Sequence, residues 1–353
     1  MTAVLRRAAA VFYSKGGIMA ADTKGQGGKS KALRLTVLVI FCIFTAAAMI
    51  LSLVFGSADI PLPRILQILL GPVSGTDGMV IWNIRFPRNI VGALVGANLA
   101  VSGAILQAVM KNPLADPGIV GVSSGAGLAG VIMLIFMPAA SLLLTPVAFI
   151  GAMLSAGAVY ALAWKNGIRP SRIILAGVAV SAFLGSGISA LLVFYADRVQ
   201  GALLWMVGGL SARSWPQVEA LFPYTVLGLV FAFCGAKALT ILSLGDETAR
   251  GLGLPVEKVR FLMTCVAALL AAGAVSIAGL IGFVGLVVPH IVRLIIGSDY
   301  KYLVPGSAVL GAGILVLCDT LGRVVFAPIE IPAGIIMAFL GAPFFLFLLR
   351  RSS

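Results

Sequence analysis

The chain has 353 residues, of which 60% are hydrophobic and only 10% are charged. Because a soluble domain carries roughly 25% charged residues, this composition excludes a soluble domain and predicts an all-α integral membrane protein. The formal net charge of +13 does not indicate nucleic-acid binding, since the positive side chains gather in the first 34 residues and in short loops between apolar stretches.

Residues 1–34 form a basic segment in which Asp22 is the only acid. The apolar run that follows, over 35–55, is long enough to span a bilayer, which requires about 20 residues. We therefore expect a disordered cytoplasmic tail and then a first transmembrane helix, with no cleavable signal peptide.

Ten apolar spans of membrane length are predicted from here to the end of the chain, so that 35–353 forms one transmembrane domain. Their expected limits are 35–55, 88–110, 118–138, 143–164, 172–195, 217–241, 259–277, 279–297, 303–322 and 332–349. With the N-terminus inside, ten spans place the C-terminus inside as well.

Most of the loop charge supports this orientation, because the loops predicted to lie inside carry the excess of Lys and Arg. The loops predicted to lie outside still hold several arginines, which are exceptions to the positive-inside rule and need a reason. They are Arg64, Arg85, Arg88, Arg198, Arg213 and Arg323.

A polar corner, VMKNPLADPGIVG, joins the second and third spans over residues 109–121. Its prolines, Pro113 and Pro117, stop one helix and start the next. We expect Lys111 on the inside and Asp116 at the start of the third helix, where the helix dipole favours a carboxylate.

Two small-residue stretches resemble each other, ALVGANLAVSGAILQA at 93–108 and AALLAAGAVSIAGLIG at 267–282. Each is expected to be a helix that leads to a proline-marked inside corner. An odd number of spans separates them, so the two halves of the chain are expected to form an inverted repeat, which is common in transporters. The small residues indicate close helix packing first, with pore lining as the alternative.

The longest polar connection, LSLGDETARGLGLPVEKVR, covers 242–260. It predicts a short helix that is capped by Ser243 or Asp246 and ended by Gly251 or Gly253. A second short helix is expected from Pro255 onward, carrying the charges of 257–260. This charged helical pair at the inner face is a candidate docking surface, with an ordinary interfacial loop as the alternative.

No catalytic constellation is visible. The chain has four cysteines, which are expected to be small buried side chains within the spans. Its single histidine, His290, rules out a His-rich metal site. Asp319 is the clearest intramembrane carboxylate, and Arg323, one helical turn later, is its expected ion-pair partner. No nucleotide-binding motif occurs, so we do not expect this chain to hydrolyse ATP itself.

Over about residues 56 to 350, the chain resembles the permeases of ABC importers for iron siderophores, haem and cobalamin (the FecCD, or cobalamin-permease-like, family). The resemblance lies in five segments in the family's order, RFPRNIVGALVGANLAVSGAILQAVMKNPLADPGIVGVSSGAG, SLGDETARGLGL, GFVGLVVPHIVRLIIG, DTLGR and EIPAGIIMAFLGAPFFLFLLR.

The resemblance implies the type II ABC importer fold of ten transmembrane helices, with two permease copies around a central path lined by the second, fifth and eighth spans. It implies that Arg85, Arg88 and Arg323 meet glutamates of a binding protein. Asn112 and Leu114 match a cytoplasmic gate, and a second gate is expected near Ser171, where the match is looser. The implied ATPase-coupling residues are Gly245, Asp246, Glu247, Ala249, Arg250, Leu252 and Gly253.

The implied partners are a second permease copy, two ABC ATPase subunits, a periplasmic or lipoprotein binding protein and membrane lipid, but no nucleic acid. No cofactor or metal is expected in this chain, since the partner ATPases hold ATP and Mg. The implied location is a bacterial or archaeal plasma membrane. Ferric siderophore is the first choice of cargo, with haem and cobalamin as alternatives. An ion-coupled secondary transporter is the other class, and only Asp319 favours it.

Overall fold

The computed structural model describes residues 31–351, except 57–59, 72–74, 166–168 and 326. The predicted tail over 1–30 lies outside the described residues. Its predicted end at residue 34 is wrong, because the first long helix, α2 (Lys31–Val54), already includes 31–34. Arg34 is held there by an ion pair of 3.0 Å with Asp299.

Each predicted span corresponds to an apolar helix close to its expected limits. These helices are α2, α5 (Phe86–Met110), α6 (Val122–Phe136), α7 (Leu144–Ala163), α8 (Pro170–Phe194), α10 (Trp215–Ser243), α12 (Val256–Ala278), α13 (Val284–Ile296), α14 (Tyr300–Val324) and α15 (Ala333–Arg351). By length and composition, 7 of the described helices can cross a membrane, and three shorter apolar helices lie in α6, α13 and α15.

Shorter helices fill the connections, and most were not predicted. They are α3 (Leu62–Leu70), α4 (Gly75–Val80), the π-helical η2 (Ile81–Arg85), η3 (Pro117–Val120), η4 (Pro138–Leu143), η5 (Ala196–Arg198), α9 (Gln200–Val207) and α11 (Asp246–Gly251). The run from α4 through η2 into α5 makes the second span 36 residues long, much longer than its sequence prediction. The charged residues and the proline of RFPR, at 85–88, do not interrupt the helix, which continues through them.

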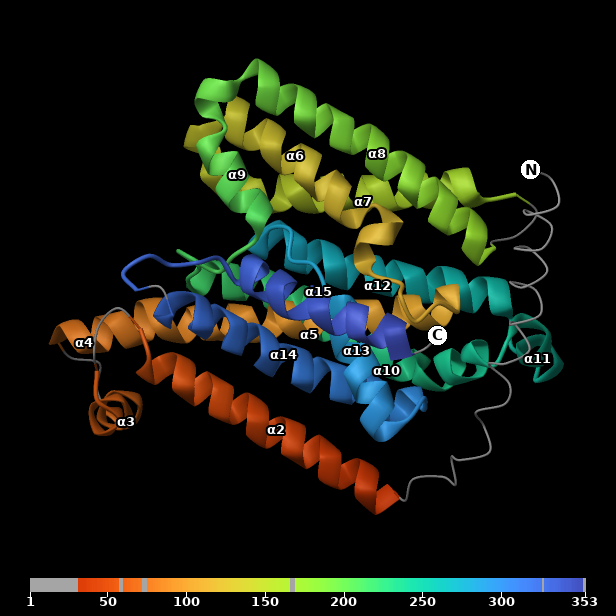
Figure 1. The fold of residues 1–353 in the computed structure, drawn as a ribbon, viewed down its shortest axis with the longest axis horizontal. Helices are drawn as coiled ribbons and strands as arrows, with labels where there is room; N and C mark the ends of the chain where they lie inside the picture. The colour runs from red at the N-terminus through yellow and green to blue at the C-terminus, as the bar shows by residue number, and fades with distance from the viewer. Residues whose placement is uncertain (1–30, 57–59, 72–74, 166–168, 326, 352–353) are drawn as a thin grey trace.

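Helix α5 lies at the centre of the bundle, with α14, α12, α10 and α13 packed around it. In Figure 1, α6, α7 and α8 form a group on one side of this centre and α2 lies at the opposite edge. Two glycines of α5 allow close approaches to its neighbours. A Cβ on Gly103 would lie 1.9 Å from the Gly285 carbonyl oxygen, and one on Gly96 would lie 2.2 Å from that of Gly311. The small residues of the second span therefore serve helix packing.

The central pair α5 and α12 is antiparallel, because the end of α5 meets the start of α12 through the ion pairs of Asp246 with Lys111 and Arg260. This arrangement agrees with the inverted order of the two similar stretches. The second stretch is not one helix, however, since α12 ends at Ala278 and Gly279 turns the chain with φ +76°.

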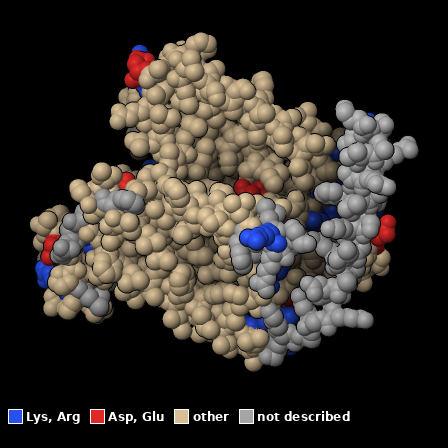
Figure 2. All heavy atoms as spheres, viewed as in Figure 1, with Lys and Arg blue, Asp and Glu red and all other residues tan. Residues whose placement is uncertain are grey.

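The outer surface of the bundle is apolar over most of its area. Figure 2 shows a broad uncharged band, with most charged side chains toward the ends of the long axis. Helix α8 is the most exposed of the long helices, with large apolar side chains such as Leu175 and Phe183 uncovered. The prediction that the cysteines are buried is wrong for three of them, because only Cys318 is buried. Position within an apolar span does not tell which face of a helix a residue occupies.

Candidate functional site at the two ends of the bundle

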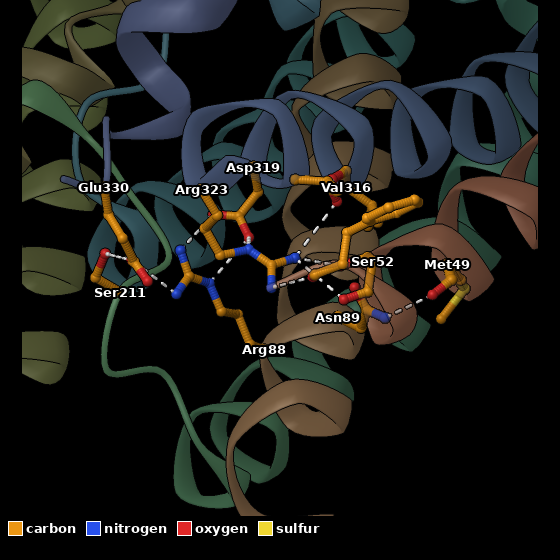
Figure 3. Close-up of polar contacts among 11 residues, drawn as sticks. Met49, Ser52, Arg88, Asn89, Ser211, Val316, Asp319, Arg323 and Glu330 are labelled. Carbon is orange, nitrogen blue, oxygen red and sulfur yellow. Dashed lines mark hydrogen bonds and ion pairs between the residues drawn. The ribbon is translucent and has the colours of Figure 1, made fainter. Parts of the chain in front are cut away.

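At the α4 end of the bundle, an arginine and acid cluster joins α5, α14 and the connection to α15 (Figure 3). Arg88 donates two hydrogen bonds to Asp319, from Nε and Nη2, both of 2.9 Å. Its Nη1 donates to Glu330 at 3.0 Å, and the Ser211 hydroxyl donates to the same Glu330 oxygen at 3.2 Å. The fork of the arginine thus ties two acids from different segments to α5.

Arg323 enters the same cluster from α14. Its Nε lies 3.2 Å from Asp319 Oδ2, which confirms the predicted ion pair one helical turn apart. Its Nη2 donates to the Ser52 hydroxyl at 2.6 Å, so the guanidinium also fixes α2. Asp319 is shared between two arginines and its side chain is only 4% exposed.

Arg85 lies in the π-helical turn before α5 and belongs to a separate contact. Its Nη1 donates to the backbone carbonyls of Leu53 at 2.7 Å and Val54 at 3.1 Å, which are at the end of α2. Those carbonyls have no partner within their own helix. Arg85 therefore caps α2 at its C-terminal end, a role that the sequence did not reveal.

All three arginines predicted to dock a partner, Arg85, Arg88 and Arg323, are buried and hold internal partners. The charged group of this cluster that reaches solvent is Glu330, whose side chain is 39% exposed. Partial burial opposes its ionisation, but the charge and hydrogen bond of Arg88 lower the pKa of Glu330 below its usual value. The docking role of the arginines stays a prediction. Glu330 is the first residue of the EIPAG segment, but the sequence reasoning gave it no role.

At the α11 end, Asp246 joins three segments that are far apart in sequence. It accepts from Lys111 at 2.6 Å and from Arg260 at 2.7 Å. Burial opposes its ionisation, but these two cationic donors lower the pKa of Asp246 below its usual value. Arg260 is only 1% exposed, whereas Asp246 and Lys111 are 28% and 32% exposed, so the contact is a partly buried brace between the corner after α5, helix α11 and the start of α12.

The predicted capping of α11 is wrong. Gly245, with φ +119°, occupies the N-cap position and no side chain caps the helix. Asp246 is instead used in the brace. The predicted second short helix is also wrong, because the residues after Pro255 form the first turns of α12. The predicted end is confirmed, since α11 stops at Gly251 and Gly253 has φ +78°.

Helix α11 presents a mixed surface. Ala249 faces inward and is fully buried. Leu244 and Leu252, which flank the helix, are each 61% exposed, and Glu247 is exposed between them. Arg250 forms an ion pair with Glu257 at the surface, and this partner raises the pKa of the Arg250 guanidinium. Two uncovered leucines beside charged groups form a surface suited to a protein partner.

The corner after α5 is shaped by two Asx turns. The Asn112 side-chain oxygen accepts from the Leu114 backbone N–H at 2.9 Å, and Asp116 accepts from Gly118 at 2.9 Å. Asp116 begins the short η3 and not α6, which starts only at Val122. Leu114 is 39% exposed, and Ser171 is exposed in the first turn of α8. Within the part of the chain that the structure describes, no hydrogen bond joins the Ser171 side chain to this corner.

One further polar link was missed by sequence reasoning. Arg293 of α13 donates to Gln107 of α5 at 2.7 Å. The Tyr300 backbone N–H, at the start of α14, donates to Thr240 of α10 at 3.0 Å. These bonds tie α13 to α5 and α14 to α10, and they join residues too distant in sequence for any local pattern to indicate them.

Among the described residues, no group of three or more His, Cys, Asp or Glu side chains could hold a metal ion. The two clusters are instead made of arginine, lysine and carboxylate pairs. Such contacts hold helices and loops together and offer surfaces for partners.

Comparison with known proteins adds a family match and several full-length similarities. The model of the FecCD transport family matches residues 38–351. The Fe(3+)-citrate import system permease protein YfmD of Bacillus subtilis (strain 168) is 39% identical over 318 residues, covering 90% of this chain and 95% of the relative. The cobalamin import system permease protein BtuC of Halobacterium salinarum is 43% identical over 300 residues, covering 83% and 80%. A solved structure, a "metal-chelate type ABC transporter" in an inward-facing conformation, gives a TM-score of 0.81 at 27% identity, covering 90% of this chain and 99% of that one.

Proposed function

Because the chain belongs to the FecCD transport family, we propose that it is the permease subunit of an ATP-driven ABC importer for a metal chelate. The family match over residues 38–351 carries this proposal. Ferric siderophore is the proposed cargo, with haem or cobalamin as alternatives. Relatives named for the import of ferric citrate and cobalamin support this class of cargo.

The α11 surface is proposed as the seat of a partner ATPase. The exposed Leu244, Glu247 and Leu252 would contact the ATPase, while buried Ala249 keeps α11 against the bundle. The Asp246 brace connects α11 to the ends of α5 and α12. A movement of α11 would therefore be passed to the two central helices as a rigid-body shift, which is the usual form of such switches.

At the opposite end, we propose that a binding protein docks through its acids near Arg88. Its carboxylate would take the place of Glu330, the partly exposed acid that now holds the Nη1 of Arg88 at 3.0 Å. Arg85 and Arg323 would act by holding α2 and α14 in place beneath this contact.

The gate at the α11 end is proposed to involve Asn112, Leu114 and Ser171. The exposed Leu114 is held by the Asn112 turn, which supports a fixed apolar plug at the mouth of a path. Of the spans expected to line that path, α8 leaves its side chains uncovered, whereas α5 is enclosed by its neighbours. We therefore assign the lining to α8 and not to α5.

The alternative of an ion-coupled secondary transporter loses its one supporting feature. That class needs an intramembrane acid that faces a cavity and can gain or lose a proton or bind a cation. Asp319 is buried between Arg88 and Arg323, accepts hydrogen bonds from Arg88 and forms an ion pair with Arg323, so its charge is already matched.

Reconstitution in proteoliposomes tests the proposal. With an ABC ATPase and a binding protein encoded beside this chain, we expect accumulation of ferric siderophore that requires ATP. Glu247→Lys should abolish the uptake, whereas Lys165→Glu, the reversal of an exposed charge just after α7, should leave it intact. Uptake driven by an ion gradient without any ATPase would refute the proposal.

A further inference from the structure

A groove of about 410 Å³ opens on the side of the bundle near its α11 end, between the last turns of α10 and the start of α14. Its lining includes Phe233, Lys237, Thr240, Asp299 and Lys301. None of these residues belongs to the clusters discussed above as docking, gating or coupling groups. The groove combines an apolar wall with two ammonium groups.

The charge in the groove is positive and unmatched. Lys237 and Lys301 are both exposed, and neither takes part in any ion pair found among the described residues. The only acid among the described lining residues is Asp299, and Arg34 already holds it at 3.0 Å. Asp299 also accepts from the Lys301 backbone N–H at 3.1 Å. Two lysines are thus left to bind an anion.

The position of Lys237 on α10 indicates that this anion comes from lipid. Lys237 continues a row of exposed apolar residues at helical spacing, Val226, Val230 and Phe233, which are 43%, 52% and 46% exposed. In a membrane-spanning helix, such a row faces acyl chains. A lysine at its end must extend its ammonium group toward the headgroups, because a charge among acyl chains is costly.

We propose that this groove binds the phosphate headgroup of an anionic phospholipid in the cytoplasmic leaflet. Lys237 and Lys301 contact the phosphate oxygens, and Phe233 packs against an acyl chain. The N-terminus of α14 contributes little to phosphate binding, since the backbone N–H groups of Tyr300 and Lys301 already donate to Thr240 and Asp299. The proposal depends on the proposed orientation that places α11 at the cytoplasmic face, and it goes beyond the transport function itself.

Lipid retention on the full chain tests this site without any ATPase or cargo. The chain, purified in detergent, is titrated with dioleoylphosphatidylglycerol against dioleoylphosphatidylcholine, and bound lipid is counted by native mass spectrometry. We expect preference for phosphatidylglycerol. Each of Lys237→Gln and Lys301→Gln should weaken its binding about fivefold, and the pair about 25-fold, since a basic residue near a lipid surface contributes about this much. Lys165→Gln, an exposed lysine at the end of α7, should change nothing.

Several results would overturn the proposal. One is that the double variant retains as much phosphatidylglycerol as the parent chain does, provided that the unfolding temperature of the variant in phosphatidylcholine is unchanged. Another is displacement of the lipid by inorganic phosphate at a similar concentration, which would indicate a soluble phosphate ligand. A third is a shift of the double variant from dimer to monomer without loss of lipid, which would make this face an interface between copies. Because the assay needs no transport, its failure would leave the importer proposal standing.

Discussion

The substitution Asp319→Asn should destabilise the protein strongly, because it removes the charge that two buried arginines share. Asp319 is 4% exposed, accepts hydrogen bonds from Arg88 at 2.9 Å and forms an ion pair with Arg323 in which the Arg323 Nε lies 3.2 Å from the Asp319 Oδ2. After the change, Glu330 still reaches Arg88, but Arg323 keeps only neutral oxygens such as the Ser52 hydroxyl. Breaking a buried pair of this kind costs about 3–5 kcal/mol.

The measurement is denaturant unfolding in detergent micelles, followed by tryptophan fluorescence. The matched control is Asp197→Asn, because Asp197 pairs with Arg198 at 3.5 Å but the two side chains are 76% and 60% exposed. An exposed pair contributes about 0–1 kcal/mol, so the control should unfold almost as the parent does.

A double-mutant cycle separates the pair from other effects of each change. Arg323→Gln alone should be destabilising, and Asp319→Asn with Arg323→Gln should cost less than the sum of the two, by about 0.5–3 kcal/mol. If Asp319→Asn costs no more than Asp197→Asn, or if the two changes in the cycle simply add, the reasoning from the shared buried carboxylate is refuted.

Three further outcomes are expected. Gly103→Ala should sharply reduce the yield of folded, monodisperse protein, because the new Cβ would lie 1.9 Å from the Gly285 carbonyl oxygen. The control Gly157→Ala, whose Cβ would have nothing within 4 Å, should stabilise the protein by up to about 1 kcal/mol. Equal yields of the two variants would contradict this packing. Asp246→Asn should lower stability near neutral pH. Burial raises the pKa of Asp246, but Lys111 and Arg260 more than offset this effect and lower the pKa below 3.8, so the stability difference from the parent should persist above pH 3.8 and shrink as pH falls through the lowered pKa. A pH series of unfolding checks the sign, and a difference unchanged at the lowest pH would refute it. Glu330→Gln should change stability by no more than about 1 kcal/mol. It should tighten binding of the partner binding protein, as measured by surface plasmon resonance. Weaker binding would argue against the proposal that an acid of the binding protein replaces Glu330 at Arg88.

Local sequence patterns were sufficient for the features that depend on neighbouring residues. Apolar length set the positions of the ten helices, since a span must satisfy its backbone hydrogen bonds internally to cross a membrane. The one-turn spacing of Asp319 and Arg323 predicted their ion pair, and glycine placement predicted the end of α11. In each case the interacting groups lie within a few residues of each other.

The tertiary structure decided which faces are covered and which distant groups meet. Arg88 and Asp319 are 231 residues apart, and Asp246 and Lys111 also lie far apart in the sequence, so no local pattern indicates either pair. The glycine-rich and alanine-rich α5 and α8 look alike in composition, yet α5 is enclosed and α8 is exposed. Small side chains permit close packing or an open lining equally well, and only the neighbours that reach a helix determine which of the two occurs.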